Sequence, residues 1–139
     1  MKERIRICQP QDCVSLLYRY RRMKQEHFGV IFLNSQKEVI QTKCFFVGSD
    51  SICYIFGKIV WWKACKLEAS AMILFHNHPS GNTSPSDIDI ELTEKFEKGG
   101  ELLGIHVLDH IIIGRDGYYS FLEHNQMSKE EKQVKAAEL

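Results

Sequence analysis

The sequence predicts a single α+β domain, and three observations lead to that class. Two pairs of apolar, β-branched runs are each joined by a short turn, which is the pattern of strand hairpins. Other segments carry apolar residues at helical spacing. The chain has 139 residues, enough for one sizeable core, and no repeat or linker divides it. We therefore expect one domain over residues 1–124 and a polar, possibly helical tail over residues 125–139.

The first half of the chain is expected to fold as two helices around a hairpin. Pro10 suits a first helical turn, and residues 12–25 form an amphipathic pattern with basic residues at its end. Residues 27–34 and 39–48 predict the two strands of the hairpin. Helical spacing returns over residues 52–69, where Gly57 weakens the helix by about 1 kcal/mol relative to alanine.

The second half predicts a strand, a helix and a final hairpin. Residues 70–78 read as a short buried strand. Residues 84–100 predict a helix that ends at the glycine pair Gly99-Gly100. Residues 105–114 and 118–122, joined by the turn at 115–117, predict the hairpin. His106 and His110 are expected to be ordinary strand residues.

Charge limits the partners of the protein. The formal net charge is zero, which argues against a broad phosphate-binding surface. A local basic cluster has two readings, a solvated helix face or a contact for an anion. Its members are Arg19, Arg21, Arg22 and Lys24.

Cysteine usage and hydropathy predict a cytoplasmic protein with no membrane partner. Five cysteines make an odd count with no CxxC pair, so reduced thiols are expected rather than a disulfide framework. The N-terminal residues lack the apolar region of a signal peptide. No apolar run reaches the roughly 20 residues that span a bilayer.

The stretch ILFHNHPSGNTSPSDID, residues 73–89, suggests a metal site. His76 and His78 are two apart in a strand, so their side chains share a face. Ser84 or Ser86 can start the next helix, which leaves an acid in its first turn. Two histidines and a carboxylate leave an open position on zinc, as catalytic sites do. A polar strand end followed by a capped helix needs no metal, however, and Asp87 and Asp89 can serve as capping residues. Both interpretations stay open on these residues alone.

The whole phrase HNHPSGNTSPSDID resembles the signature of the JAMM (MPN+) metalloproteases, and with GGELLGIHVLDHIIIG it looks like the RadC family. The similarity runs from about Ile7 to Leu122 and includes EHFGVIFLNSQKEVI, which is similar to the first hairpin of that family. The resemblance implies a curved mixed β-sheet flanked by helices, with the cytidine-deaminase-like shape of JAMM domains. It also implies Zn²⁺ bound by His76, His78 and Asp89, with Ser86 supporting the attacking water and the developing oxyanion. The implied activity is that of a zinc metallohydrolase of the metallopeptidase type acting on a peptide or protein.

One position departs from the family pattern. JAMM hydrolysis uses a glutamate as general base, expected on the second strand of the first hairpin, and gap-free counting places Lys43 there. A cationic lysine cannot accept a proton and would repel Zn²⁺. A shifted register with Glu38, another acid such as Asp50, or a Lys43 that loses its proton by desolvation would restore a base. The remaining possibility is a domain that binds metal and catalyses little.

Three functions therefore compete: a zinc metallohydrolase, an inactive metal-binding interaction module, and a DNA-repair factor. The last follows only from the association of the RadC name with repair, and zero net charge counts against direct nucleic-acid binding. The helix-hairpin-helix region of longer family members is not found in this sequence. Trp61 and Trp62 are adjacent on a helix, so they point in directions about 100° apart. One core indole and one edge indole, or a homodimer contact, would explain the pair.

Overall fold

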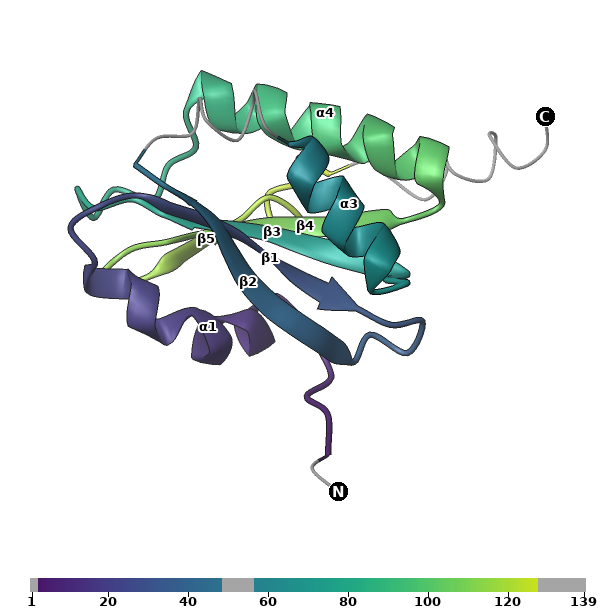
Figure 1. The fold of residues 1–139 in the computed structure, drawn as a ribbon. Helices are drawn as coiled ribbons and strands as arrows, with labels where there is room; N and C mark the ends of the chain where they lie inside the picture. Colours follow the sequence, from purple (N-terminus) through teal and green to yellow (C-terminus); the bar gives the residue numbers. More distant parts are fainter. Residues whose placement is uncertain (1–2, 49–56, 128–139) are drawn as a thin grey trace.

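The computed structural model describes residues 3–48 and 57–127, which form a mixed sheet covered on both faces by helices (Figure 1). The strand order is β2-β1-β3-β4-β5. Strand β1 is antiparallel to β2 and to β3, β3 and β4 are parallel, and β4 and β5 are antiparallel. The predicted α+β class and both hairpins are confirmed. The strands are β1 (His27–Leu33), β2 (Val39–Val47), β3 (Ala71–Asn77), β4 (His106–Ile113) and β5 (Tyr118–Ser120).

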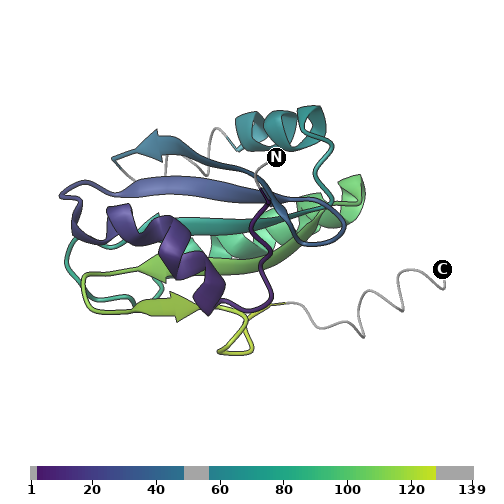
Figure 2. The same cartoon turned by 90° about the horizontal axis from the view of Figure 1, so that it is seen from below.

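The helices divide between the two faces of the sheet. Helix α1 (Gln11–Leu17) and the 3-10 turn η1 (Tyr18–Arg22) lie on one face, and Figure 2 shows α1 crossing it. Helices α3 (Lys58–Lys66) and α4 (Asp87–Leu103) cover the other face. Helix α4 is the crossover that connects the parallel strands β3 and β4.

Side chains of the central strands alternate between two core layers, which fixes the face on which the site is built. Met72 and Leu74 of β3 pack in the layer that includes residues of α3 and α4. Ile73 and Phe75 pack in the layer that includes residues of α1 and η1. The same alternation directs His76 toward the α4 face.

Two predicted helices differ from the observed ones. Where the sequence predicted one helix over 12–25, the structure has α1 followed by the 3-10 turn η1, which ends at Arg22. Tyr20 of this turn is buried in the core. The predicted helix over 52–69 is observed as α3, which runs from Lys58 to Lys66. Residues 49–56 lie outside the described part of the chain.

The glycine pair Gly99-Gly100 does not end α4, contrary to the prediction. The helix continues to Leu103 and ends at Gly104, whose φ of 72° is left-handed. A Cβ on Gly100 would lie 2.2 Å from the Ile105 carbonyl oxygen, and one on Gly99 would lie 2.8 Å from the Trp61 ring. The pair therefore permits close packing inside the helix.

The two tryptophans take different environments, with Trp61 partly buried against the core and Trp62 exposed at the edge, close to the expected pair of one core and one edge indole. Trp61 stacks on Phe96, with ring centroids 5.3 Å apart. Trp62 is 60% exposed and carries the Lys66 ammonium 4.8 Å from its ring centroid.

The packed core extends slightly beyond residue 124, because Met127 is buried against Ile112 and Phe121. Residues 128–139 of the predicted tail lie outside the described ranges. Among the described helices, none combines the length and the apolar character that crossing a membrane requires.

Candidate metal centre

His76 and His78 meet where β3 ends, as the strand periodicity predicted. The Nε2 atoms of the two imidazoles are 2.8 Å apart. His76 is 1% exposed, and Phe28 of β1 lies over its ring. The backbone N–H of His78 donates to the carbonyl of Ile113, so the parallel pairing of β3 with β4 continues to this residue. The sheet therefore holds both rings at one buried point.

Asp89 reaches the same point from the first turn of α4. Its Oδ1 lies 3.2 Å from His76 Nε2, and its Oδ2 lies 3.3 Å from His78 Nε2. The carboxylate is fixed by a capping box, because the backbone N–H of Ser86 donates to Oδ2 and the Ser86 hydroxyl accepts from the backbone N–H of Asp89. Capping and metal ligation, which the sequence offered as alternatives for Asp89, are compatible in one conformation.

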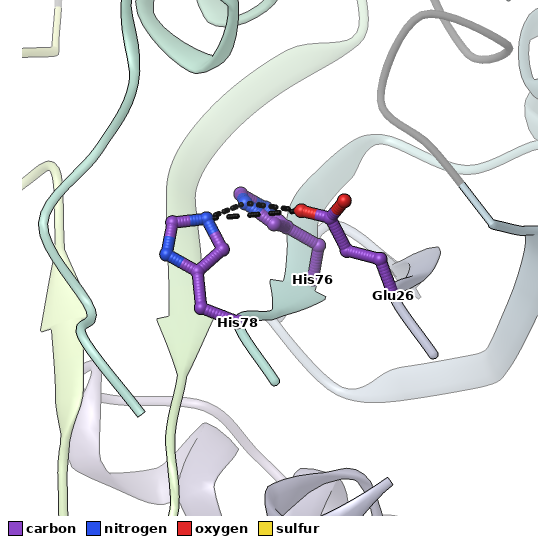
Figure 3. A group of neighbouring side chains, drawn as sticks. All are labelled: Glu26, His76 and His78. Carbon is purple, nitrogen blue, oxygen red and sulfur yellow. Dashed lines mark hydrogen bonds and ion pairs between the residues drawn. The ribbon is translucent and has the colours of Figure 1, made fainter. Parts of the chain in front are cut away.

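Glu26 is a fourth member of the cluster that the sequence interpretation missed. Its Oε1 lies 4.0 Å from His76 Nε2 and 3.8 Å from His78 Nε2, and Figure 3 shows the carboxylate pointing toward both rings. These three side chains form a group that could hold a metal ion. Glu26 directly precedes β1, whose Phe28 pairs with His76. An acid at the entrance of an apolar strand was the signal available in the sequence.

Asn77, between the two histidines, positions Glu26 from the other face of the sheet. Its side-chain oxygen accepts from the backbone N–H of His27 at 2.6 Å, and its amide donates to the carbonyl of Gln25 at 3.0 Å. The carbonyl of Glu26 itself accepts from Gly48 N–H at 2.8 Å. The backbone on both sides of Glu26 is thus tied down, which leaves its side chain as the flexible part.

A buried chain of hydrogen bonds determines which nitrogen of His76 carries the proton. The Thr93 hydroxyl donates its only proton to the Asp89 carbonyl, so it must accept from Nδ1–H of His110, 2.6 Å away. Burial, reinforced by His76, holds the pKa of His110 well below its usual range, so this imidazole is neutral. Its Nε2 therefore accepts from His76 Nδ1–H at 2.8 Å. The neutral form of His76 is therefore the tautomer with its lone pair on Nε2.

His78 reaches the same protonation pattern independently. Its Nδ1 lies 2.7 Å from the carbonyl oxygen of Asn82, which can only accept, so Nδ1 carries the proton. In the neutral forms, two Nε2 lone pairs would face each other at 2.8 Å beside the carboxylate of Asp89. This arrangement repels unless a proton or metal cation lies between the groups. Burial lowers the pKa of His78, but the Asp89 carboxylate and the Asn82 carbonyl outweigh it and raise the pKa overall.

The spacing of the cluster fits a tetrahedral ion. Zinc bonds of 2.0–2.1 Å to nitrogen and oxygen place neighbouring ligand atoms about 3.3 Å apart. The distances from Asp89 to the two imidazoles match this value, and the histidine pair is slightly closer. Glu26 lies farther from both rings. The geometry favours His76, His78 and Asp89 as ligands, with Glu26 one water molecule away.

The other predicted site residues lie elsewhere. Lys43 is exposed in the middle of β2, with its ammonium 5.7 Å from the Phe45 ring centroid, and the structure does not bring it to the histidines. Glu38 bonds Asn34 in the first hairpin turn. Asp50 lies outside the described residues. Gap-free counting predicted the base on β2, whereas the acid that the structure brings near the histidines is Glu26, which directly precedes β1.

Comparison with known proteins identifies the family. Residues 7–127 match the RadC-like JAB domain. The chain is 43% identical over 119 residues to a UPF0758 protein of Clostridium kluyveri, covering 85% of this chain and 52% of that protein. It is 44% identical over 123 residues to a UPF0758 protein of Alkaliphilus metalliredigens, covering 88% and 53%. A Methanosarcina acetivorans relative of the same name is 43% identical over 120 residues, covering 85% and 52%. The chain thus spans about half the length of the curated relatives it matches. Because the family match covers residues 7–127 of its 139 residues, the chain belongs to the RadC-like JAB domain family.

Proposed function

We propose that this domain is a zinc-dependent hydrolase of the metallopeptidase type, with His76, His78 and Asp89 as the metal ligands. The observation that carries the proposal is the convergence of two Nε2 lone pairs and a fixed carboxylate on one buried point, with Glu26 beside it. Two nitrogen ligands and one carboxylate match the donor set of catalytic zinc sites. Membership in a JAB-domain family supports the same metal and reaction class.

Zinc bound there would polarise the carbonyl of a scissile amide and lower the pKa of a water molecule next to it. Glu26 is proposed to take the proton of the attacking water and to pass it to the leaving amine. Its carboxylate is 25% exposed, so it can reach solvent and substrate. The Ser86 hydroxyl accepts from Asp89 N–H, and its own proton can be donated to the developing oxyanion. Asn77 holds the backbone that carries Glu26.

Exchange of Glu26 for glutamine tests the proposal. Glu26→Gln keeps the size of the side chain and removes the base, so hydrolysis of a peptide library by the zinc-loaded protein should fall about 10²–10⁴-fold. Zinc content should stay at the wild-type level, because Glu26 is not proposed as a ligand. Lys43→Gln is the matched control on the neighbouring strand and should leave the rate unchanged. Loss of activity in Lys43→Gln with full activity in Glu26→Gln would reject the assignment of the base.

The inactive-module alternative rested on Lys43 at the place of the base and on the tryptophan pair as a contact surface. Glu26 beside the histidines offers a base at another position and so supports the hydrolase over the module. The exposed Trp62 is compatible with a protein contact in either case. A cytoplasmic location is also proposed, since the four cysteines of the described ranges, Cys8, Cys13, Cys44 and Cys65, are all free thiols.

A further inference from the structure

A cationic cleft opens beside the metal centre, at the end of the sheet where β3 finishes. Its cavity of 690 Å³ is lined by Arg21 and Arg22 of η1, by Lys24 just after η1, and by Arg115 from the β4–β5 turn. Pro79 and Asp116 also line it. Four cationic side chains from two distant segments therefore face one concavity that contains a single carboxylate, although the whole chain has zero net charge.

The cations of the cleft are not used to hold the fold together. Within residues 3–48 and 57–127, none of the four forms an ion pair with a carboxylate. The Arg21 guanidinium stacks on Tyr18, 3.8 Å from the ring centroid, and its Nε is buried without a hydrogen-bond partner among these residues. A buried guanidinium N–H that lacks an acceptor is costly, so an anionic ligand would improve this site.

The cleft is continuous with the candidate metal centre along the chain. Pro79 directly follows the ligand His78, and Lys24 lies two residues before Glu26, at most about 7 Å in Cα distance. Arg115 lies over Gly81, in the turn closed by the bond from Gly81 N–H to the His78 carbonyl. A chain bound at the metal centre would reach the cleft within about two to four extended residues.

We propose that this cleft binds acidic side chains of the substrate, so that the enzyme prefers peptides with Asp or Glu a few residues from the scissile bond. The inference rests on the proposed hydrolase function. Arginine presents a planar fork that pairs with carboxylates in a bidentate manner, and three of the four cations are arginines. A concave cluster suits a short acidic segment, whereas a polynucleotide needs an extended basic track and a basic domain. The sequence pI of about 7.0 is not that of a basic domain, so the acidic peptide is the better match.

Direct peptide binding tests the cleft separately from catalysis. Fluorescein-labelled dodecapeptides of alternating Gly and Glu, Gly and Gln, or Gly and Lys are titrated with the full chain as wild type and as Glu26→Gln, with polarisation as the readout. The Gly/Glu peptide should bind at least about tenfold more tightly than the Gly/Gln peptide, with affinity falling as salt rises. Equal affinity for the two peptides would overturn the proposal.

Charge reversal locates the binding surface. Arg22→Glu/Arg115→Glu should weaken Gly/Glu binding about tenfold or more, because two attractions become repulsions. The matched control Lys58→Glu/Lys98→Glu changes net charge equally on the exposed surface of α3 and α4 and should stay within about twofold. Equal losses in both variants, or stronger binding of a thymidine dodecanucleotide than of the Gly/Glu peptide, would reject an acidic-peptide cleft. If only the hydrolase proposal fails, Gly/Glu binding persists without cleavage; if only the cleft fails, neutral peptides are still cleaved.

Discussion

Replacement of Thr93 by valine should weaken zinc binding although Thr93 is not itself a proposed ligand. The hydroxyl donates to the Asp89 carbonyl and accepts from His110 Nδ1–H, and both residues Thr93 and His110 are buried. In Thr93→Val, the Nδ1–H of His110 loses its acceptor, which costs about 1–3 kcal/mol of folding free energy. His110 can avoid that cost by moving its proton to Nε2. It then donates toward His76, whose own proton must shift to Nε2, the atom directed at the metal.

The change in tautomer predicts the size of the effect. Removing a group that orients a metal-bound histidine typically costs about 10–100-fold in metal affinity. Zinc affinity is measured by competition with a chromogenic chelator, and the tautomer of His76 in the metal-free protein by ¹⁵N NMR. Thr93→Ser, which keeps the hydroxyl, is the matched control and should bind zinc like the wild type. Equal zinc affinities for the valine and serine variants, or an unchanged His76 tautomer in Thr93→Val, would refute this reasoning.

Three further predictions concern the metal, pH and assembly. The variant His76→Ala/His78→Ala should lose about one zinc per chain in metal analysis, and zinc content equal to wild type would contradict the site. Burial raises the pKa of Asp109 to about 6 despite hydrogen bonds from Ser120 and backbone N–H groups. Protonated Asp109 is therefore favoured in the folded state relative to the unfolded chain. Its contribution to the free energy of unfolding is fully present below about pH 4 and is lost, by roughly 3 kcal/mol, as the pH rises through 6. Asparagine does not ionise, so Asp109→Asn should not show this loss. The unfolding free energy of the variant minus that of the wild type should therefore be larger at pH 7.5 than at pH 4.5, and an equal difference at both pH values would be contrary evidence. A homodimer through the exposed Trp62 is proposed, and sedimentation at micromolar concentration should show a dimer that Trp62→Glu dissociates; a monomeric wild type would end that proposal.

The part of the site that the sequence predicted is the part built locally. His76 and His78 are two residues apart in a strand, so strand periodicity predicted that they share a face, and capping rules placed an acid in the first turn of the next helix. The choice of Asp89 as the ligand came from the resemblance to the JAMM signature. The fold class and hairpins followed from periodicity in the same way. These features depend on contacts between residues close in the chain.

The missed residues depend on pairing between distant segments. Glu26 reaches His76 only because β1 pairs with β3, fifty residues later in the chain, and because Asn77 holds the backbone beside it. His110, expected to be an ordinary strand residue, contacts His76 through the parallel pairing of β3 with β4 and Thr93 through the crossover helix. Local patterns predicted the strands that pair across a hairpin turn, but they do not identify which strands from distant parts of the chain become neighbours.

The charges of the metal centre and of the cleft support each other in the proposed enzyme. Asp89 and Glu26 bring two negative charges to a point where two imidazoles present lone pairs. Zn²⁺ would balance both carboxylates, so the loaded centre would neither attract nor repel an acidic segment strongly. The adjoining cleft, with four cations against Asp116, would then dominate the local field and draw acidic side chains toward the scissile position. Without the metal, the two carboxylates would oppose that attraction. Acidic-peptide affinity should therefore rise on zinc loading by a similar factor in the wild type and in Glu26→Gln, because Zn²⁺ adds two positive charges in both. In either metal state Glu26→Gln, which lacks one carboxylate, should bind the acidic peptide more tightly than the wild type. An affinity that responds neither to zinc nor to Glu26→Gln would show that the two sites are electrostatically separate.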